Sequence, residues 1–158
     1  MLKTEIILAL KAFSTHACFP IIREYLSGTT ASSVFEANLA QEFGKSVHLY
    51  SPAYKPAEME TLTSIASHIT FNSLLQWNTF VPRLKKEHPS IQLGLRLNPE
   101  HSEVQTALYD PCCSYSRLGI TARELGDFIP DELDGIHIHN LCLILQMEEE
   151  EGKDERYN

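Results

Sequence analysis

Short hydrophobic runs alternate along this chain with segments in which hydrophobic residues recur every three or four positions. The runs have the length of β-strands, and the periodic segments have the spacing of amphipathic helices. We predict strands over residues 6–11, 29–32, 47–51, 69–72, 92–98 and 135–139. We predict helices over residues 19–26, 35–43, 56–67 and 73–88, and a shorter one over 122–128. Such alternation, with short turns, is typical of a parallel α/β fold.

Glycine, proline and threonine residues indicate where several of these helices begin and end. Gly28 and Gly44 are expected to end the first two helices, because glycine readily adopts the left-handed conformation that follows a helix. Pro56 is expected in the first turn of the third helix, and Pro82 is expected to interrupt the fourth. Thr121 is expected to cap the short last helix.

The turn after the first strand distinguishes two kinds of parallel α/β fold. An open nucleotide-binding sheet usually has a glycine-rich turn there, whereas this chain has the residues AFST at 12–15. The strand pattern is compatible with a barrel and with an open doubly wound sheet, and the missing glycines favour the barrel. We therefore predict a partial parallel β/α barrel of about six strands.

Lys11 directly follows the first hydrophobic run, Ile6 to Leu10. A continuous hydrophobic run predicts a strand buried on both faces, and barrel enzymes place their chemistry at the carboxyl ends of such strands. A partly desolvated lysine has a lowered pKa, so more of it is the free amine that attacks a carbonyl group to form a Schiff base. The alternative is that Lys11 only extends from the strand end into solvent.

Three other polar side chains lie close to predicted strand ends. Arg96 interrupts a hydrophobic strand, and a guanidinium there needs a partner such as a phosphate or a carboxylate. Asn72 is either a turn residue or part of a site. Glu36 follows the second strand, where it either stabilises the start of the next helix or lines a pocket.

His137 and His139 share one face of the last predicted strand, because side chains repeat every second residue. Two histidines at this spacing could ligate a metal ion, but no third ligand is evident at a matching strand end. The four cysteines have no C-x-x-C spacing, which argues against a zinc site and a disulfide framework. We therefore predict no metal site, and reduced thiols in a cytoplasmic protein.

Composition narrows the class of protein further. The net charge of −8 argues against nucleic-acid binding, because a phosphate backbone attracts a basic face. No hydrophobic run is long enough to span a membrane, and the N-terminus lacks the pattern of a secretory signal. The hydrophobic content of 43% is enough for a core. We expect a single domain that neither spans a membrane nor binds nucleic acid.

Several segments, in order and with similar gaps, resemble the pyridoxal-phosphate-dependent decarboxylases that have an alanine racemase-like barrel. They are ALKAFS (9–14), SGTTASSVFEA (27–37), HLYSPAY (48–54), ITFNS (69–73), LGLRLNP (93–99), SRLG (116–119) and GIHIHNLC (135–142). Within this group the chain resembles the carboxynorspermidine (carboxyspermidine) decarboxylases, from about residue 6 to residue 142.

The resemblance implies roles for four residues of this chain. Lys11 matches the lysine that holds pyridoxal phosphate, and His139 matches the histidine that stacks on the cofactor ring. Arg96 matches an arginine near the cofactor, and Glu36 matches a glutamate of the pocket. The implied function is decarboxylation of carboxynorspermidine or carboxyspermidine in polyamine biosynthesis, with pyridoxal phosphate as the electron sink. The full-length family is expected to form homodimers.

The chain also departs from this family. The family's enzymes are longer, with further barrel strands, a glycine-rich phosphate loop and a C-terminal β domain, and they have a glutamate where this chain has Leu143. We expect residues 1–142 to form a partial barrel and residues 143–158 to form a divergent, disordered acidic tail. Such a fragment is expected to be inactive alone. The alternative is a non-catalytic remnant that at most binds pyridoxal phosphate or a full-length partner.

Overall fold

The computed structural model describes residues 4–104 and 107–140, and within them six parallel strands form one sheet. The strands are β1 (Ile7–Ala9), β2 (Gly28–Ala31), β3 (Ser46–Tyr50), β4 (His68–Phe71), β5 (Gln92–Leu97) and β6 (Gly135–Ile138). Neighbouring strands pair in chain order, from β1 to β6. An open doubly wound sheet would reverse its strand order at some point. The unbroken order therefore confirms the predicted partial β/α barrel.

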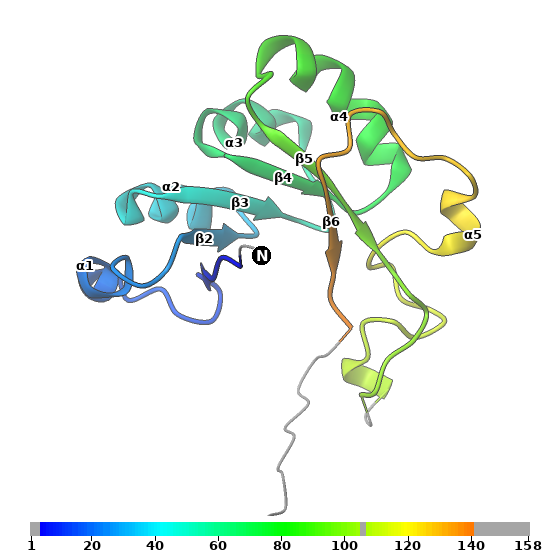
Figure 1. Cartoon of the computed structure of the whole chain (residues 1–158), viewed down its shortest axis with the longest axis horizontal. Helices are drawn as coiled ribbons and strands as arrows, with labels where there is room; N and C mark the ends of the chain where they lie inside the picture. Colours follow the sequence, from blue (N-terminus) through cyan, green and yellow to red (C-terminus); the bar gives the residue numbers. More distant parts are fainter. Residues whose placement is uncertain (1–3, 105–106, 141–158) are drawn as a thin grey trace, which may run out of the picture.

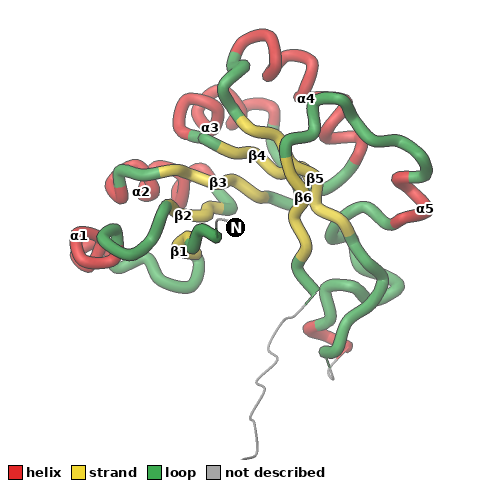
Figure 2. Tube along the Cα trace, in the orientation of Figure 1, coloured by secondary structure: helices red, strands yellow, loops and turns green. Residues whose placement is uncertain are grey.

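The longer helices lie on the outer side of this curved sheet. The helices are α1 (Phe19–Ile22), α2 (Val34–Phe43), α3 (Met59–Ile65), α4 (Leu74–Glu87) and α5 (Ala122–Leu125). Short 3-10 helices are found at His16–Cys18, Pro56–Glu58 and Ala107–Tyr109. Figure 1 shows α1 to α4 one after another along the outside of the sheet, and Figure 2 shows the strands curving away from them. This arrangement leaves the concave side of the sheet open for a site.

A hydrophobic core fills the space between the sheet and the outer helices. Alternate residues of the central strands face this core, among them Leu49, Phe71 and Leu95, each at most 2% exposed. The helices contribute Phe43 and Trp77 to the same cluster. Because strand side chains alternate between faces, the remaining residues of these strands face the concave side.

Polar residues line the concave side. The strand register places Thr30 beside His48, which in turn pairs with His68. The rings of these two histidines stack, with their centroids 3.9 Å apart. Nearer the other edge of the sheet, Arg96 pairs with His137. These residues border two cavities, of about 430 and about 960 Å³.

Side-chain caps fix the turns that lead from β2 and β4 into the following helices. The Oγ of Ser33 accepts a hydrogen bond from the backbone N–H of Glu36 (3.2 Å), whose carboxylate accepts one from the residue before Ser33 (2.7 Å). The same pattern recurs at α4, where Ser73 caps the helix and the Gln76 side chain bonds to the residue before Ser73 (2.9 Å). The turn from β2 into α2 and the turn from β4 into α4 therefore have the same capped geometry.

Two predicted helix ends are confirmed. Gly44 ends α2 in the left-handed conformation, with φ of 73°. Thr121 caps α5 and forms a capping box with Glu124, in which each side chain bonds to the backbone of the other residue. The helix itself is shorter than predicted, because it ends at Leu125.

β1 is shorter and more exposed than predicted. Its residues are half-buried, and the preceding Ile6 is 65% exposed. Among the described residues β1 pairs with β2 alone, so it forms an edge of the sheet. The prediction of a strand buried on both faces is therefore wrong, because a hydrophobic run does not reveal whether a strand has neighbours on both sides.

Gly28 and Pro82 do not act as predicted. The first helix ends earlier, and Gly28 instead begins β2, where a Cβ would clash with the adjacent Ser46. α4 continues through Pro82 although proline has no N–H to donate. The flanking Trp77 and Leu84 are buried against the core, so tertiary packing holds the helix on both sides of the lost hydrogen bond.

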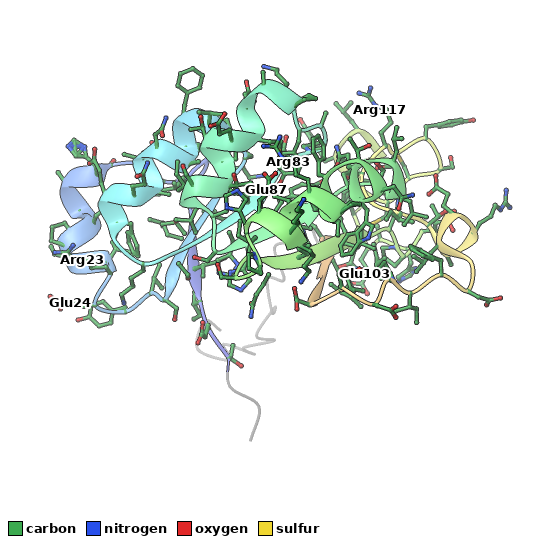
Figure 3. The ribbon with its side chains drawn as sticks, turned by 90° about the horizontal axis from the view of Figure 1, so that it is seen from above. Arg23, Glu24, Arg83, Glu87, Glu103 and Arg117 are labelled. Atoms are coloured by element: carbon green, nitrogen blue, oxygen red, sulfur yellow. The ribbon has the colours of Figure 1, made fainter. Side chains whose placement is uncertain are left out.

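The outward side of α4 faces solvent. There the Arg83 Nε donates a hydrogen bond of 2.6 Å to the Glu87 carboxylate one turn later, and Figure 3 shows the two side chains together. Both side chains are largely exposed, so this pair contributes little to stability.

Two sequence predictions concern the ends of the chain and its membrane class. The predicted acidic tail, residues 143–158, lies outside the described residues. In the part of the chain that the structure describes, no helix has the length and hydrophobicity needed to cross a bilayer.

Replacing Phe71 by alanine tests the core. The Phe71 ring is fully buried and contacts the rings of Tyr54, Trp77 and Phe80. We expect Phe71→Ala to lower the free energy of unfolding by about 3–5 kcal/mol in urea titrations. The control is Leu75→Ala on the exposed side of α4, which should change it by less than about 0.5 kcal/mol. Similar losses in both variants would contradict the assigned core.

Candidate active site

The carboxyl ends of the strands surround the larger cavity, which has a volume of about 960 Å³. Its lining comes from the turn after β1, the ends of β2 to β6, and the loop between β5 and α5. All four site residues predicted from the sequence line it: Lys11, Glu36, Arg96 and His139. The fold therefore brings together side chains that the sequence places in four separate strand–helix units.

Lys11 lies in the turn directly after β1. The backbone N–H groups of Ala12 and Phe13 both donate to the carbonyl of Ala9, at 3.0 and 3.1 Å, and this turn directs the chain away from the sheet. The Lys11 side chain is exposed and forms no hydrogen bond or ion pair with another described residue. The desolvation expected from a buried strand end is thus absent here, and the amine is free to meet a ligand.

Arg96 is a buried cation in the lining of the cavity. It is 5% exposed, and its Nη1 donates a hydrogen bond of 2.6 Å to the hydroxyl of Tyr50. Within residues 4–104 and 107–140, no carboxylate forms an ion pair with it. A buried guanidinium has five N–H donors and needs acceptors for them. Its remaining donors are therefore available to an anionic group in the cavity.

Tyr50 and Asn72 extend this contact across the sheet. The Tyr50 hydroxyl donates to the Asn72 Oδ1 (2.8 Å), which also accepts the backbone N–H of Gly119 (2.8 Å). The Asn72 Nδ2 donates to the Arg117 carbonyl (2.8 Å). Asn72 is thus a buried junction and not only a turn residue. Tyr50 was not predicted, although its position two residues after His48 indicates the concave side of β3.

Gly119 permits the close approach of this loop to β5. Its φ is +87°, and a Cβ there would lie 2.9 Å from the backbone of Leu97 and Asn98. The next residue, Ile120, bonds to the Arg96 carbonyl through its N–H (2.9 Å) and accepts from the Asn98 N–H (2.8 Å). The loop is therefore attached directly to the strand that carries Arg96.

His137 and His139 stand beside Arg96 at the end of β6. Burial, followed by the charges of Arg96 and His139, lowers the pKa of His137 to about 4. Burial, followed by the charges of Arg96 and Lys11, lowers the pKa of His139. The two rings are 6.4 Å apart, and the His137 ring meets the Tyr50 ring edge-on at 4.9 Å. Both imidazoles are therefore neutral at pH 7 and can pack against a ligand.

Glu36 combines the two roles that the sequence left open. Its Oε2 accepts hydrogen bonds from the backbone N–H (2.7 Å) and the hydroxyl (2.9 Å) of Ser32, which fixes the start of α2. The same side chain lines the cavity. Its Oε1 forms no hydrogen bond with a described residue, so one carboxylate oxygen remains for a ligand.

The loop between β5 and α5 forms one wall of the cavity and is tied to the chain after β6. Ser102 donates its hydroxyl to the Asn140 carbonyl (3.1 Å), and the Cys112 thiol lies 3.9 Å from the His139 carbonyl. The same loop contributes Asp110 and Cys113 to the cavity lining. These contacts connect the loop to the backbone of His139 and Asn140.

Metal binding finds no support in the described residues. No group of three or more histidine, cysteine, aspartate or glutamate side chains there is arranged to hold a metal ion. A metal site needs three or four such ligands.

Two curated proteins match most of this chain. It is 50% identical over 139 residues to the carboxyaminopropylagmatine decarboxylase of Synechocystis sp., covering 87% of this chain and 35% of that protein. It is 41% identical over 139 residues to the carboxynorspermidine/carboxyspermidine decarboxylase of Campylobacter jejuni, with the same coverage of both chains. No established family profile matches the chain.

A solved structure agrees with these relatives. The carboxynorspermidine decarboxylase of Campylobacter jejuni, complexed with norspermidine, superimposes with a TM-score of 0.72 and 36% sequence identity. The superposition covers 88% of this chain and 34% of that one. The chain resembles these decarboxylases in both sequence and fold. The resemblance predicted from the sequence motifs is therefore confirmed, and the chain spans about a third of the length of these relatives.

More distant structures share the fold. A diaminopimelate decarboxylase from Helicobacter pylori, complexed with L-lysine, superimposes with a TM-score of 0.73 at 17% identity and covers 87% of this chain. At this identity the likeness supports the barrel architecture alone. It agrees with the sequential parallel sheet described above.

The concave histidines predict a pH-dependent stability. Burial, followed by the charge of His68, lowers the pKa of His48 to about 4, and the pKa of His137 is also about 4, against 6.5 for an ordinary histidine. Below pH 6.5 the unfolded chain binds protons that the folded chain does not, so the free energy of unfolding should fall as the pH drops towards 4. Urea titrations at about pH 7.5 and about pH 5 measure this loss.

The matched variant is His48→Gln, which removes one titrating ring. It should reduce the loss of stability between the two pH values. The difference between variant and wild type at about pH 7.5, where both imidazoles are neutral, reports packing alone and serves as the internal control. An undiminished loss in the variant would show that His48 does not cause it.

Proposed function

We propose that this chain provides the pyridoxal-phosphate-binding part of a decarboxylase that acts on a carboxylated polyamine. The observation that carries the proposal is the shared cavity, which is lined by Lys11, Glu36, Arg96 and His139. The similarity to decarboxylases at 41–50% identity supports the reaction class. The chain spans about a third of these relatives, so we propose that it does not complete the reaction alone.

The residues present fit such a cofactor. Pyridoxal phosphate carries an aldehyde, a flat ring and an anionic phosphate. Lys11 offers an amine without a partner among the described residues, and the neutral His139 offers a flat face. Arg96 is a buried cation that no described carboxylate neutralises. A cavity of about 960 Å³ is large enough for a cofactor and part of a substrate.

Each side chain then has a defined task. Lys11 would hold the aldehyde carbon through its Nζ, and His139 would pack on the ring. Arg96 would bind an anionic oxygen, and the Oε1 of Glu36 would accept a hydrogen bond from an amine or a ring substituent. When bound, pyridoxal phosphate supplies the electron sink that accepts the electron pair left behind when carbon dioxide departs. The Lys11 amine could also carry a proton within the cavity when it is not bonded to a ligand.

The charge of the chain supports a polyamine substrate. The net charge is −8, which favours the approach of a polycation. Within the cavity, the carboxylates of Glu36 and Asp110 provide acceptors for ammonium groups. We propose carboxynorspermidine or carboxyspermidine as the substrate, within polyamine biosynthesis in the cytoplasm, and a homodimer as the assembly of the complete enzyme.

A second candidate substrate is favoured by sequence identity. The chain is 50% identical to a carboxyaminopropylagmatine decarboxylase and 41% identical to a carboxynorspermidine/carboxyspermidine decarboxylase. The first substrate ends in a guanidino group where the others end in an amine. All three compounds are carboxylated polyamines, so the decarboxylation at Lys11 would be the same for each.

Lys11→Ala tests the cofactor site. Purified chain mixed with pyridoxal phosphate should show the visible absorbance of an imine, and borohydride should fix the label on the peptide that contains Lys11. Lys11→Ala should lose both signals, because the amine is absent. The control Lys86→Ala, an exposed lysine on α4 outside the cavity, should keep both. Equal labelling of wild type and Lys11→Ala would contradict the proposal.

Release of carbon dioxide separates the enzyme from the non-catalytic alternative. The cofactor-loaded chain is mixed with carboxynorspermidine, carboxyspermidine or carboxyaminopropylagmatine, each labelled in its carboxyl group. We expect at most slow release from the chain alone, because it spans about a third of its relatives. Rapid release would show that the described cavity suffices. Complete absence of release despite a label on Lys11 would favour the remnant that only binds the cofactor.

A further inference from the structure

Tyr50 connects Arg96, one of the predicted site residues, to Asn72 at the end of the neighbouring strand. It ends β3, and its hydroxyl joins Arg96 of β5 to Asn72 at the end of β4, with bonds of 2.6 and 2.8 Å. The carbon of the guanidinium also lies 4.9 Å from the centroid of the Tyr50 ring. One side chain therefore restrains the cation through both its ring and its hydroxyl.

The direction of these hydrogen bonds is fixed by the backbone. The N–H of Gly119 can only donate, so the atom of Asn72 that meets it must be the amide oxygen. The Nδ2 of the same amide meets the Arg117 carbonyl, which can only accept. The Tyr50 hydroxyl must then donate its proton to this oxygen, and its lone pair is left to accept from Arg96.

This direction has a consequence for the charge of the site. A neutral hydroxyl holds the guanidinium in place without cancelling its charge, whereas a carboxylate at the same position would neutralise it. Burial raises the pKa of Tyr50, and the nearby Arg96 opposes this shift only in part, so the hydroxyl stays neutral at pH 7. The titratable groups facing Arg96 are Tyr50, His137, His139 and Cys112, and none of the described carboxylates pairs with it.

We propose that Tyr50 is a positioning residue that holds Arg96 as an uncompensated cation facing an anionic oxygen of the ligand in the cavity. The inference rests on the proposed function, because the ligand is taken to be pyridoxal phosphate or a carboxylated polyamine. The anionic oxygen belongs either to the phosphate of the cofactor or to the carboxylate of the substrate.

Tyr50→Phe tests the proposal through binding. The variant keeps the ring but removes the acceptor for Arg96, and a hydrogen bond from a charged donor is strong enough that its loss should weaken ligand binding about tenfold or more. Dissociation constants are measured on the full chain for pyridoxal phosphate and for pyridoxal. A phosphate contact predicts weaker binding of the first compound alone. A substrate contact predicts unchanged binding of both and weaker binding of carboxynorspermidine to the loaded chain.

Tyr54→Phe is the matched control. Tyr54 is a buried tyrosine close by in the chain, and its hydroxyl donates to the Thr70 carbonyl (3.1 Å) without lining the cavity. It should lose stability in thermal unfolding with no change in any dissociation constant. Equal dissociation constants for Tyr50→Phe, Tyr54→Phe and the wild type would overturn the proposal.

A double-mutant cycle shows whether Tyr50 acts through Arg96. In an Arg96→Met background, adding Tyr50→Phe should cause no further weakening of binding, whereas a purely structural effect would add to it. If Arg96→Met does not fold, Arg96→Lys replaces it, because a lysine cannot keep the same bond and ring contact together. Additive effects would overturn the proposal and leave the proposed function standing. Absence of pyridoxal phosphate binding to the wild-type chain would instead overturn the proposed function, and the inference with it.

Discussion

Parallel pairing of the strands in chain order is the constraint on which the candidate site depends. Each crossover moves one strand further in the same direction, so every strand delivers its carboxyl end to the same rim. The register then sets which side chains are neighbours, as it does for Arg96 and His137. Hydrophobic side chains such as Phe71 face the helices, and the alternate positions are free to carry polar groups into the concave side. The cavity is a consequence of this division.

The sequence was sufficient for features that follow from local patterns. Hydrophobic runs located the strands, and two residues that end or interrupt them, Lys11 and Arg96, line one cavity. Their chemical roles remain proposals. The local pattern failed where a neighbour decides the outcome. It could not show that β1 pairs on one side only within the described part of the chain. Nor could it show that Lys11 is exposed, or that buried side chains hold α4 together through Pro82.

The sequence pattern could not predict the contacts between residues that are far apart in the sequence. Tyr50 and Asn72 lie within motifs recognised from the sequence, yet their hydrogen bonds join β3, β4, β5 and a loop around Gly119. Each of these hydrogen bonds joins residues more than twenty positions apart in the sequence, and hydrophobic periodicity does not predict contacts of that range. The network matters because it leaves Arg96 charged and fixed. A cavity with a fixed guanidinium, an exposed lysine and neutral imidazoles is suited to an anionic aldehyde cofactor.

The crystal structure of this chain grown with pyridoxal phosphate tests the central claim most directly. The account predicts electron density for the cofactor in the larger cavity, continuous with the Nζ of Lys11 and beside the ring of His139, with an anionic oxygen in reach of Arg96. Density on another lysine, or an empty cavity with a free Lys11 at saturating cofactor, would contradict it.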